Sequence, residues 1–176
     1  KVDRESHMVR IPNSVINKTL SMCSSTVRLY NRRDPEPMIV GGNNVHFGTV
    51  GIATNVLDYQ TNEYRAVLTQ DLIDFISLAD ALPNVDYLQA PATPTEVPAG
   101  VVDLIETREL LLHTTKHFIA EGANGQNVRK TIAMCSEIAG GLENLKKRPF
   151  ITMQICLTSP LHFRKDCSEL AIEWGK

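Results

Sequence analysis

The stretch VDYLQAPATPTEVPAGVVDLIETRELLLHTTKHFIA, residues 85–120, predicts a strand, a helix and a second strand in that order. The runs 85–89 and 117–120 are short and largely apolar, which is typical of buried strands. A helix is expected between them, over about residues 99–113. Its inward face is expected to carry Val101, Leu104, Ile105 and Leu112. A strand, a helix and a strand in succession indicate a parallel pair of strands.

The same alternation extends in both directions from this stretch. Strands are expected to begin near residues 45, 85, 117 and 150, so their starts are about 40, 32 and 33 residues apart. Further helices are expected over 69–82, from about 128 to the pair Gly140–Gly141, and over 166–174. Four β-α units predict an α/β fold, the first half of a (β/α)8 TIM barrel. A flavodoxin-like open sheet is the competing architecture, and periodicity does not separate the two.

The first 44 residues have a different character. They predict small strands, one of them over 24–30, and a short helix that begins at Pro12. The domain organisation expected is therefore a β-rich amino-terminal decoration over 1–44 and a half-barrel over 45–176. Within the second part, a hairpin is expected to turn at residues 60–63.

The composition excludes several classes of protein. Lys and Arg total 18 and Asp and Glu total 20, so the formal net charge is −2, and 43% of residues are hydrophobic. These values exclude a disordered chain and a generally basic nucleic-acid binder. No apolar run reaches the roughly 20 residues that span a bilayer, so no membrane association and a cytoplasmic location are expected. The four cysteines form no C-x-x-C pair and predict buried free thiols rather than a metal site.

Five segments, in order, carry a family resemblance: VDRESHMVRIP at 2–12, GGNNVHFGTVGIATNVLD at 41–58, DLIDFISLADALPNVDYL at 71–88, LLHTTKHFI at 111–119 and RPFITMQICLTSPL at 148–161. The ordered set resembles the trimethylamine methyltransferase family, which includes non-pyrrolysine relatives that act on glycine betaine. The resemblance implies a complete eight-stranded barrel in longer proteins. The chain is therefore expected to be an amino-terminal piece of such a protein.

The resemblance also implies a reaction, in which a methyl group moves from trimethylamine or a related quaternary amine, such as glycine betaine, to a Co(I) corrinoid. The corrinoid is carried by a separate protein, within methylamine metabolism and methanogenesis. The cobalt is then the nucleophile, so no catalytic side chain is assigned in this chain. The expected partners are the small amine, the corrinoid protein and further copies of the chain in a homo-oligomer.

Candidate substrate-binding residues follow from the geometry of a barrel, because its active site lies at the carboxyl ends of the strands. The residues expected there are Phe47, Gly48, Thr49, Gln89, Glu121, Thr158 and Ser159. An aromatic ring and a carboxylate suit a methylated ammonium cation. Each also has an ordinary alternative: Phe47 as a core residue, Glu121 as a solvated charge, and Thr158 and Ser159 as helix caps.

A second function stays open at this stage. Half a barrel exposes strand edges and apolar surface, so the chain is alternatively expected to be a binding or assembly module without catalytic activity of its own. On either view, the isolated 176-residue chain is expected to be inactive and to fold poorly.

Overall fold

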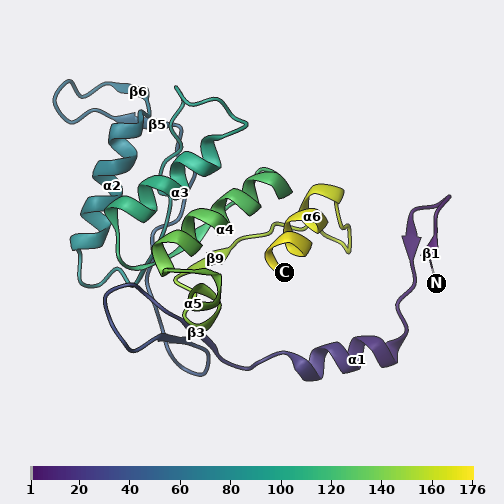
Figure 1. The fold of residues 1–176 in the computed structure, drawn as a ribbon. Coiled ribbons are helices and arrows are strands. Elements are labelled where there is room, and N and C mark those ends of the chain that lie inside the picture. The colour runs from purple at the N-terminus through teal and green to yellow at the C-terminus, as the bar shows by residue number, and fades with distance from the viewer. Residues whose placement is uncertain (1) are drawn as a thin grey trace.

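Three short parallel strands form the central sheet in the computed structural model, which describes residues 2–176 (Figure 1). They are β7 (Tyr87–Gln89), β8 (His117–Ala120) and β9 (Ile151–Met153), in the spatial order β7-β8-β9. Leu88 lies opposite Phe118, and Phe118 lies opposite Ile151. The parallel strands predicted from the sequence are thus confirmed, and β8 has the predicted bounds. Within residues 2–176 no sheet is closed.

Five helices accompany this sheet. They are α2 (Thr69–Ala81), α3 (Val102–His113), α4 (Gly125–Ala139), α5 (Leu142–Lys147) and α6 (Lys165–Trp174). Contacts run from α2 to α3, from α3 to α4 and from α4 to α6, so these helices form a row beside the sheet (Figure 1). Helix α5 was not predicted, because the pair Gly140–Gly141 indicated only an end. Gly140 does end α4 in a left-handed conformation, and α5 begins one residue after Gly141.

The hydrophobic core lies between the helices and one face of the sheet. Successive strand residues point to opposite faces. The strand residues in the core are Leu88, Phe118, Ala120, Ile151 and Met153, and the helical ones include Leu72, Ile76, Leu110, Val128 and Leu170. The intervening positions are largely polar: Gln89, His117, Thr152 and Gln154. The second face of the sheet is therefore built for hydrogen bonds.

His117 shows how this polar face is satisfied. Its ring is buried, with Nδ1 2.8 Å from the carbonyl oxygen of Tyr30 and Nε2 2.9 Å from Oγ1 of Thr152. A carbonyl oxygen only accepts, so Nδ1 carries the proton and Nε2 accepts from the Thr152 hydroxyl. Burial lowers the pKa of His117, which favours this neutral form.

The segment predicted as the first strand, residues 45–50, carries one isolated bridge in place of a continuous strand, and a second bridge follows at Ala53. Gly48 pairs with Tyr87 and Ala53 pairs with Ala92, both in parallel orientation. A Cβ at position 48 would lie 2.4 Å from the Tyr87 ring, so this position requires glycine. The segment still lies beside β7, as expected, but side-chain bonds replace part of the strand ladder: Thr49 Oγ1 donates to the Gln89 carbonyl oxygen at 2.6 Å.

The amino-terminal segment forms small hairpins and one helix. The elements are β1 (Val2–Asp3), β2 (Met8–Val9), α1 (Asn13–Met22), β3 (Val27–Leu29) and β4 (Met38–Val40). The first three project away from the rest of the protein (Figure 1), and α1 buries none of its residues. A further hairpin, β5 (Asn55–Leu57) with β6 (Tyr64–Ala66), has the predicted turn.

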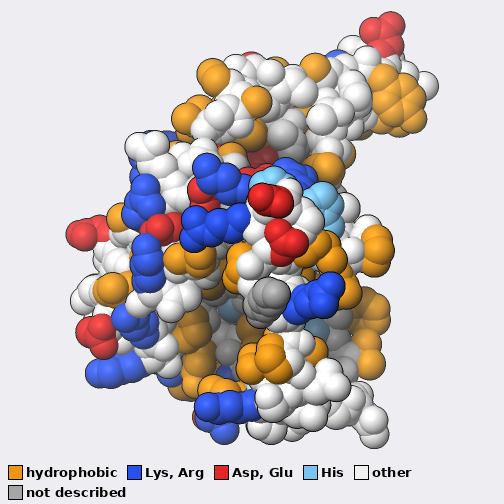
Figure 2. All heavy atoms as spheres, turned by 90° about the vertical axis from the view of Figure 1, so that its right-hand side faces the viewer, with side chains coloured by type: hydrophobic (Ala, Val, Ile, Leu, Met, Phe, Trp, Pro, Cys, Tyr) orange, Lys and Arg blue, Asp and Glu red, His pale blue; other side chains and the backbone are white. Residues whose placement is uncertain are grey.

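Hydrophobic side chains are visible among the Lys and Arg side chains on the face that carries this amino-terminal segment (Figure 2). Val15, Leu20 and Met22 of α1 are all at least half exposed. Within residues 2–176, no helix combines the length and the apolar character that a membrane crossing requires.

Two sequence predictions about burial were wrong. Helix α3 was expected to bury Val101, Leu104, Ile105 and Leu112, but its buried residues are Asp103, Thr107, Glu109, Leu110 and Leu111. Leu112 is 59% exposed. The buried polar groups are tolerated because they have partners, described below. Of the four cysteines, Cys135 and Cys167 are buried as expected, whereas Cys23 and Cys156 are exposed because they lie in loops at the ends of α1 and β9.

Arg32 joins the amino-terminal segment to the sheet and helices. Its guanidinium donates to the carbonyl oxygens of Leu111, at 2.7 Å, and Thr114 at the end of α3. It also lies 5.5 Å from the centre of the Phe150 ring. A cation at a helix carboxyl terminus is favourable, because the free carbonyl groups there carry partial negative charge.

We expect Arg32→Met to lower the free energy of unfolding by about 1.5 kcal/mol, because it removes the two bonds to α3 while retaining apolar contact with Phe150. Arg33→Met is the matched control, since that side chain is 61% exposed and its ion pair with Asp80 spans 3.5 Å. The control should change stability by less than about 0.5 kcal/mol. Equal urea midpoints for the two variants would contradict the role of Arg32.

Candidate functional site

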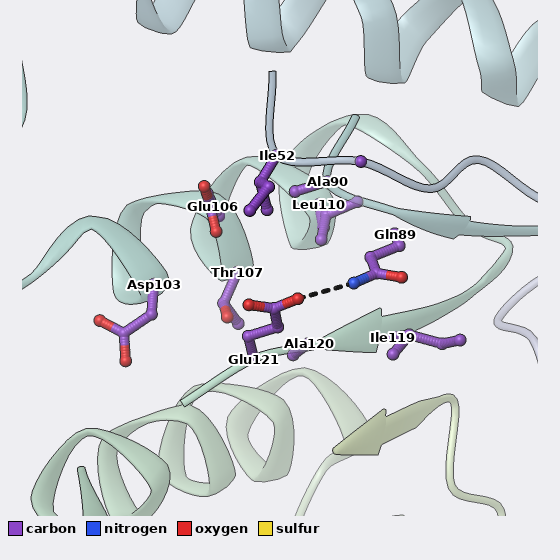
Figure 3. A pocket seen from close by; sticks show the side chains of 11 residues that line it. Ile52, Gln89, Ala90, Asp103, Glu106, Thr107, Leu110, Ile119, Ala120 and Glu121 are labelled. Atoms are coloured by element: carbon purple, nitrogen blue, oxygen red, sulfur yellow. Dashed lines mark hydrogen bonds between the residues drawn. The ribbon is translucent and has the colours of Figure 1, made fainter. Parts of the chain in front are cut away.

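A small cavity opens where β7 and β8 end, beside the first turns of α3 (Figure 3). The strands contribute Gln89 and Glu121, and α3 contributes Asp103 and Glu106. The remaining lining is mostly small or aliphatic: Gly51, Ile52, Ala90, Thr107, Leu110, Ile119 and Ala120. The carboxyl ends of parallel strands are where α/β proteins bind ligands.

Gln89 is the central hydrogen-bonding group of this cavity. Its side-chain Nε2 donates to Oε1 of Glu121 at 2.8 Å (Figure 3) and to Oε1 of Gln154, also at 2.8 Å. Its backbone N–H donates to Oγ1 of Thr49 at 3.0 Å. Because Gln89 is buried and bonds to three separate segments, at Thr49, Glu121 and Gln154, it fixes the Glu121 carboxylate at the cavity.

Glu106 approaches the cavity from the helix side. One carboxyl oxygen accepts from Oγ1 of Thr93 at 2.8 Å. The pKa of Glu106 is raised to about 7, chiefly by burial and to a lesser extent by the negative charges of Glu121 and Asp103, whereas the Thr93 bond acts to lower it. A carboxyl that titrates near neutral pH is typical of a functional site.

The Asp103 side chain has a structural role. Its carboxylate is buried and accepts from Nδ2 of Asn127, at 2.8 and 3.1 Å to its two oxygens, and from the backbone N–H of Ala123 at 2.8 Å. It therefore joins α3 to α4 and to the loop after β8. Asp103, Glu106 and Glu121 also line an adjoining cleft of about 290 Å³, which extends to Thr54, Thr93 and Gly122.

The arrangement suits a small cation. Carboxyl groups from two sides face an otherwise small and aliphatic space, and a positive ligand would relieve the repulsion between them. Within residues 2–176, no group of three or more His, Cys, Asp or Glu side chains is placed to hold a metal ion.

The structure brings together three of the seven residues predicted for the site. Gln89 bonds to Glu121 through its side chain and to Thr49 through its backbone. Phe47 and Gly48 lie towards the opposite end of β7. The Phe47 N–H donates to the Asp86 carboxylate at 2.8 Å, and Gly48 is bridged to Tyr87. Phe47 is 66% exposed, so it is not the core residue considered as an alternative.

Thr158 and Ser159 lie in the loop between β9 and α6, and both are exposed. Thr158 pairs with His162 through two backbone bonds, at 2.9 and 3.3 Å. Helix α6 begins only at Lys165, so neither residue caps it. Neither contributes to the lining of the cavity described above.

Sequence reasoning missed Glu106 and Asp103. A signal was present, because Asp103, Thr107 and Leu110 recur at helical spacing and form one face of α3. The stronger apolar pattern of Leu104, Ile105 and Leu112 concealed it.

The parallel strands, the row of helices and the cavity at the strand ends define an α/β protein with the kind of site that binds small molecules. The family model described as trimethylamine methyltransferase (MTTB) matches residues 1–174. The chain belongs to this trimethylamine methyltransferase family, which confirms the resemblance noted in the sequence.

Similar proteins bear the same description. Trimethylamine methyltransferase MttB of Desulfitobacterium hafniense is 28% identical over 176 residues, which are 100% of this chain and 36% of that protein. Trimethylamine methyltransferase MttB of Methanosarcina thermophila is 29% identical over 181 residues, covering 100% of this chain and 38% of that protein. The chain thus spans between 36% and 38% of the length of these relatives.

Proposed function

We propose that the protein, at its full natural length, transfers a methyl group from trimethylamine or a related quaternary amine, such as glycine betaine, to the Co(I) corrinoid of a partner protein. Membership of the family supports methyl transfer. The observation that carries the proposal is the cleft of about 290 Å³ that Glu106 and Glu121 line, next to the small cavity at Gln89. A methylated ammonium ion is the cation that such a space would hold.

The roles of the side chains follow from their positions. Glu121, held by Gln89, would face the ammonium group from the sheet, and Glu106 would face it from α3. The aliphatic Ile52 and Val102, which line the same cleft, would contact the methyl groups. The corrinoid, held by the partner protein, would supply the methyl acceptor. As the methyl carbon moved to that acceptor, the carbon–nitrogen bond would break and its electron pair would remain on the amine nitrogen.

The strand order supports the first half of a (β/α)8 barrel as the proposed architecture. The Gly48 segment, β7, β8 and β9 are neighbours in sequence order and all run in parallel. Successive helices contact one another in a row. In a flavodoxin-like sheet, the strand order reverses at a switch point, which this part of the chain does not do.

We expect Glu121→Gln in the full-length protein to weaken the binding of trimethylammonium about tenfold, since it removes one negative charge while retaining an acceptor for Gln89. Titration calorimetry with trimethylamine hydrochloride measures this, and production of dimethylamine in the presence of the corrinoid protein measures turnover. Glu143→Gln is the control, because that carboxylate is 78% exposed on α5. The proposal fails if the unaltered protein neither binds trimethylammonium nor yields dimethylamine.

A second candidate function is a binding or assembly module. It is favoured by an apolar groove beside α4, α5 and the end of α6, lined by Ile132, Leu142, Leu145, Pro149, Ile151 and Trp174. Within residues 2–176, β9 also pairs on one side only, with β8. The intact mass of the natural gene product separates the two: a mass near that of this chain, 19.6 kDa, favours the module, and a larger one favours the enzyme. A monodisperse monomer in light scattering would count against the module.

A further inference from the structure

Two cysteines lie together where the chain leaves β9 and enters α6. The Cys167 thiol, in the first turn of α6, is 3.1 Å from the carbonyl oxygen of Cys156. Cys156 is exposed, whereas Cys167 is buried. This contact places the Cys167 sulfur against the backbone of the residue that carries the second thiol.

From this juxtaposition we propose that Cys156 and Cys167 form a reversible disulfide, which makes the loop between β9 and α6 a site of oxidative modification. The two residues are separated by the ten residues 157–166. That loop is already closed in the folded protein, so bridging its ends costs little further entropy. The loop itself is exposed, including Leu157, Leu161 and Phe163, and can adjust to the geometry of a disulfide.

The chemistry requires a two-electron oxidant, for which a hydroperoxide suffices. The exposed Cys156 sulfur attacks the peroxide, a sulfur–oxygen bond forms, and the oxygen–oxygen bond breaks to release water or an alcohol. The Cys167 sulfur then attacks the Cys156 sulfur, the sulfur–sulfur bond forms, and the sulfur–oxygen bond breaks to release water. In total, two thiols lose two hydrogen atoms and the peroxide is reduced. A dithiol reductant reverses the change.

The disulfide would act on the cavity through Gln154. Nε2 of Gln154 is 3.3 Å from the Cys156 sulfur, and Oε1 of Gln154 accepts from Gln89 at 2.8 Å. Gln89 in turn holds Glu121. When the Cys156 sulfur moves to Cys167, Gln154 loses this partner and its amide is free to turn. Oxidation of the loop therefore alters the group that positions the cavity carboxylate.

The test is oxidation of the full-length protein with a small excess of hydrogen peroxide, followed by proteolysis and mass spectrometry without reduction. We expect a peptide pair that joins Cys156 to Cys167, lacking two hydrogen atoms and lost on treatment with dithiothreitol. Cys156→Ser and Cys167→Ser should each abolish it. Cys23→Ser is the matched control, because that exposed thiol lies at the end of α1 and donates to the Thr19 carbonyl oxygen of that helix, at 3.5 Å. The control should leave the linked peptide unchanged.

Three outcomes overturn the proposal: no linked peptide, a disulfide between two protein molecules, or oxidation of Cys156 to the sulfinic acid with no bond to Cys167.

The effect of the disulfide on the cavity rests on the proposed function and has its own measurement. Oxidation should weaken trimethylammonium binding about threefold in the unaltered protein, the value of a modest hydrogen bond, but not in Cys167→Ser. If the disulfide forms and the reduced protein binds no trimethylammonium, the proposed function fails and the modification site stands.

Discussion

Asp103→Ala is expected to lower the free energy of unfolding by about 3 kcal/mol, because it leaves buried donors without an acceptor. Asp103 is 5% exposed, and its oxygens accept from the Asn127 side chain and from the Ala123 N–H. Asn127 is itself buried, at 4% exposed. Its amide retains only the Gly100 carbonyl oxygen, at 2.9 Å, once the carboxylate is removed.

Urea unfolding of the full-length protein measures the loss, and amide hydrogen exchange localises it. Exchange at Ala123 should accelerate, because its N–H then faces no protein acceptor. Asp74→Ala is the control, since Asp74 is exposed on α2 and accepts from Gln70 of the same helix, so its loss should cost less than about 0.5 kcal/mol. If Ala123 remains equally protected in Asp103→Ala, the carboxylate is not what joins α3 to the loop after β8.

The regular elements could be predicted because local signals set them. The residues of β8 and the turn of the β5–β6 hairpin were correct, and α2 and α6 began within one residue of the expected positions. The segment 45–50 was predicted as a strand because it begins the alternation of short apolar segments with helices. Its conformation depends instead on two distant residues, since the Tyr87 ring lies on Gly48 and the Gln89 carbonyl accepts from Thr49.

The candidate site was predictable only in part, because it too depends on contacts between residues that are distant in the sequence. Gln89 and Glu121 could be placed at strand ends from the sequence alone. Glu106 and Asp103 were missed, because burial of a carboxyl on a helix is favourable only with partners that the sequence does not reveal. These partners are Thr93 for Glu106 and Asn127 for Asp103, 13 and 24 residues away. Apolar periodicity therefore assigned the wrong face of α3 to the core.

Glu106→Gln should stabilise the protein at pH 8 but have little effect at pH 5. The pKa of Glu106 is raised from 4.5 to about 7 in the folded protein, so the folded state favours the protonated carboxyl. The stability that this group contributes is then fully present below pH 4.5 and is lost as the pH rises through about 7. The whole shift corresponds to about 3.4 kcal/mol, and for a partly exposed carboxyl we expect about 2 kcal/mol.

The free energies of unfolding of Glu106→Gln and the unaltered protein, measured in urea at both pH values, give this difference directly. Gln retains an acceptor for Thr93, so the variant changes the charge and not the bond. If the free energies of unfolding of the two proteins differ by the same amount at pH 5 and at pH 8, Glu106 is ionised in the folded protein at both pH values.

Binding of trimethylammonium is a second measurement, and here the expected effect of Glu106→Gln has the opposite sign. At pH 8 the ionised Glu106 attracts the cation, so Glu106→Gln should bind it more weakly there, whereas near pH 5 the two proteins should bind it alike. A residue that destabilises the fold at the pH where it strengthens ligand binding is what a cation site built from opposed carboxyls requires.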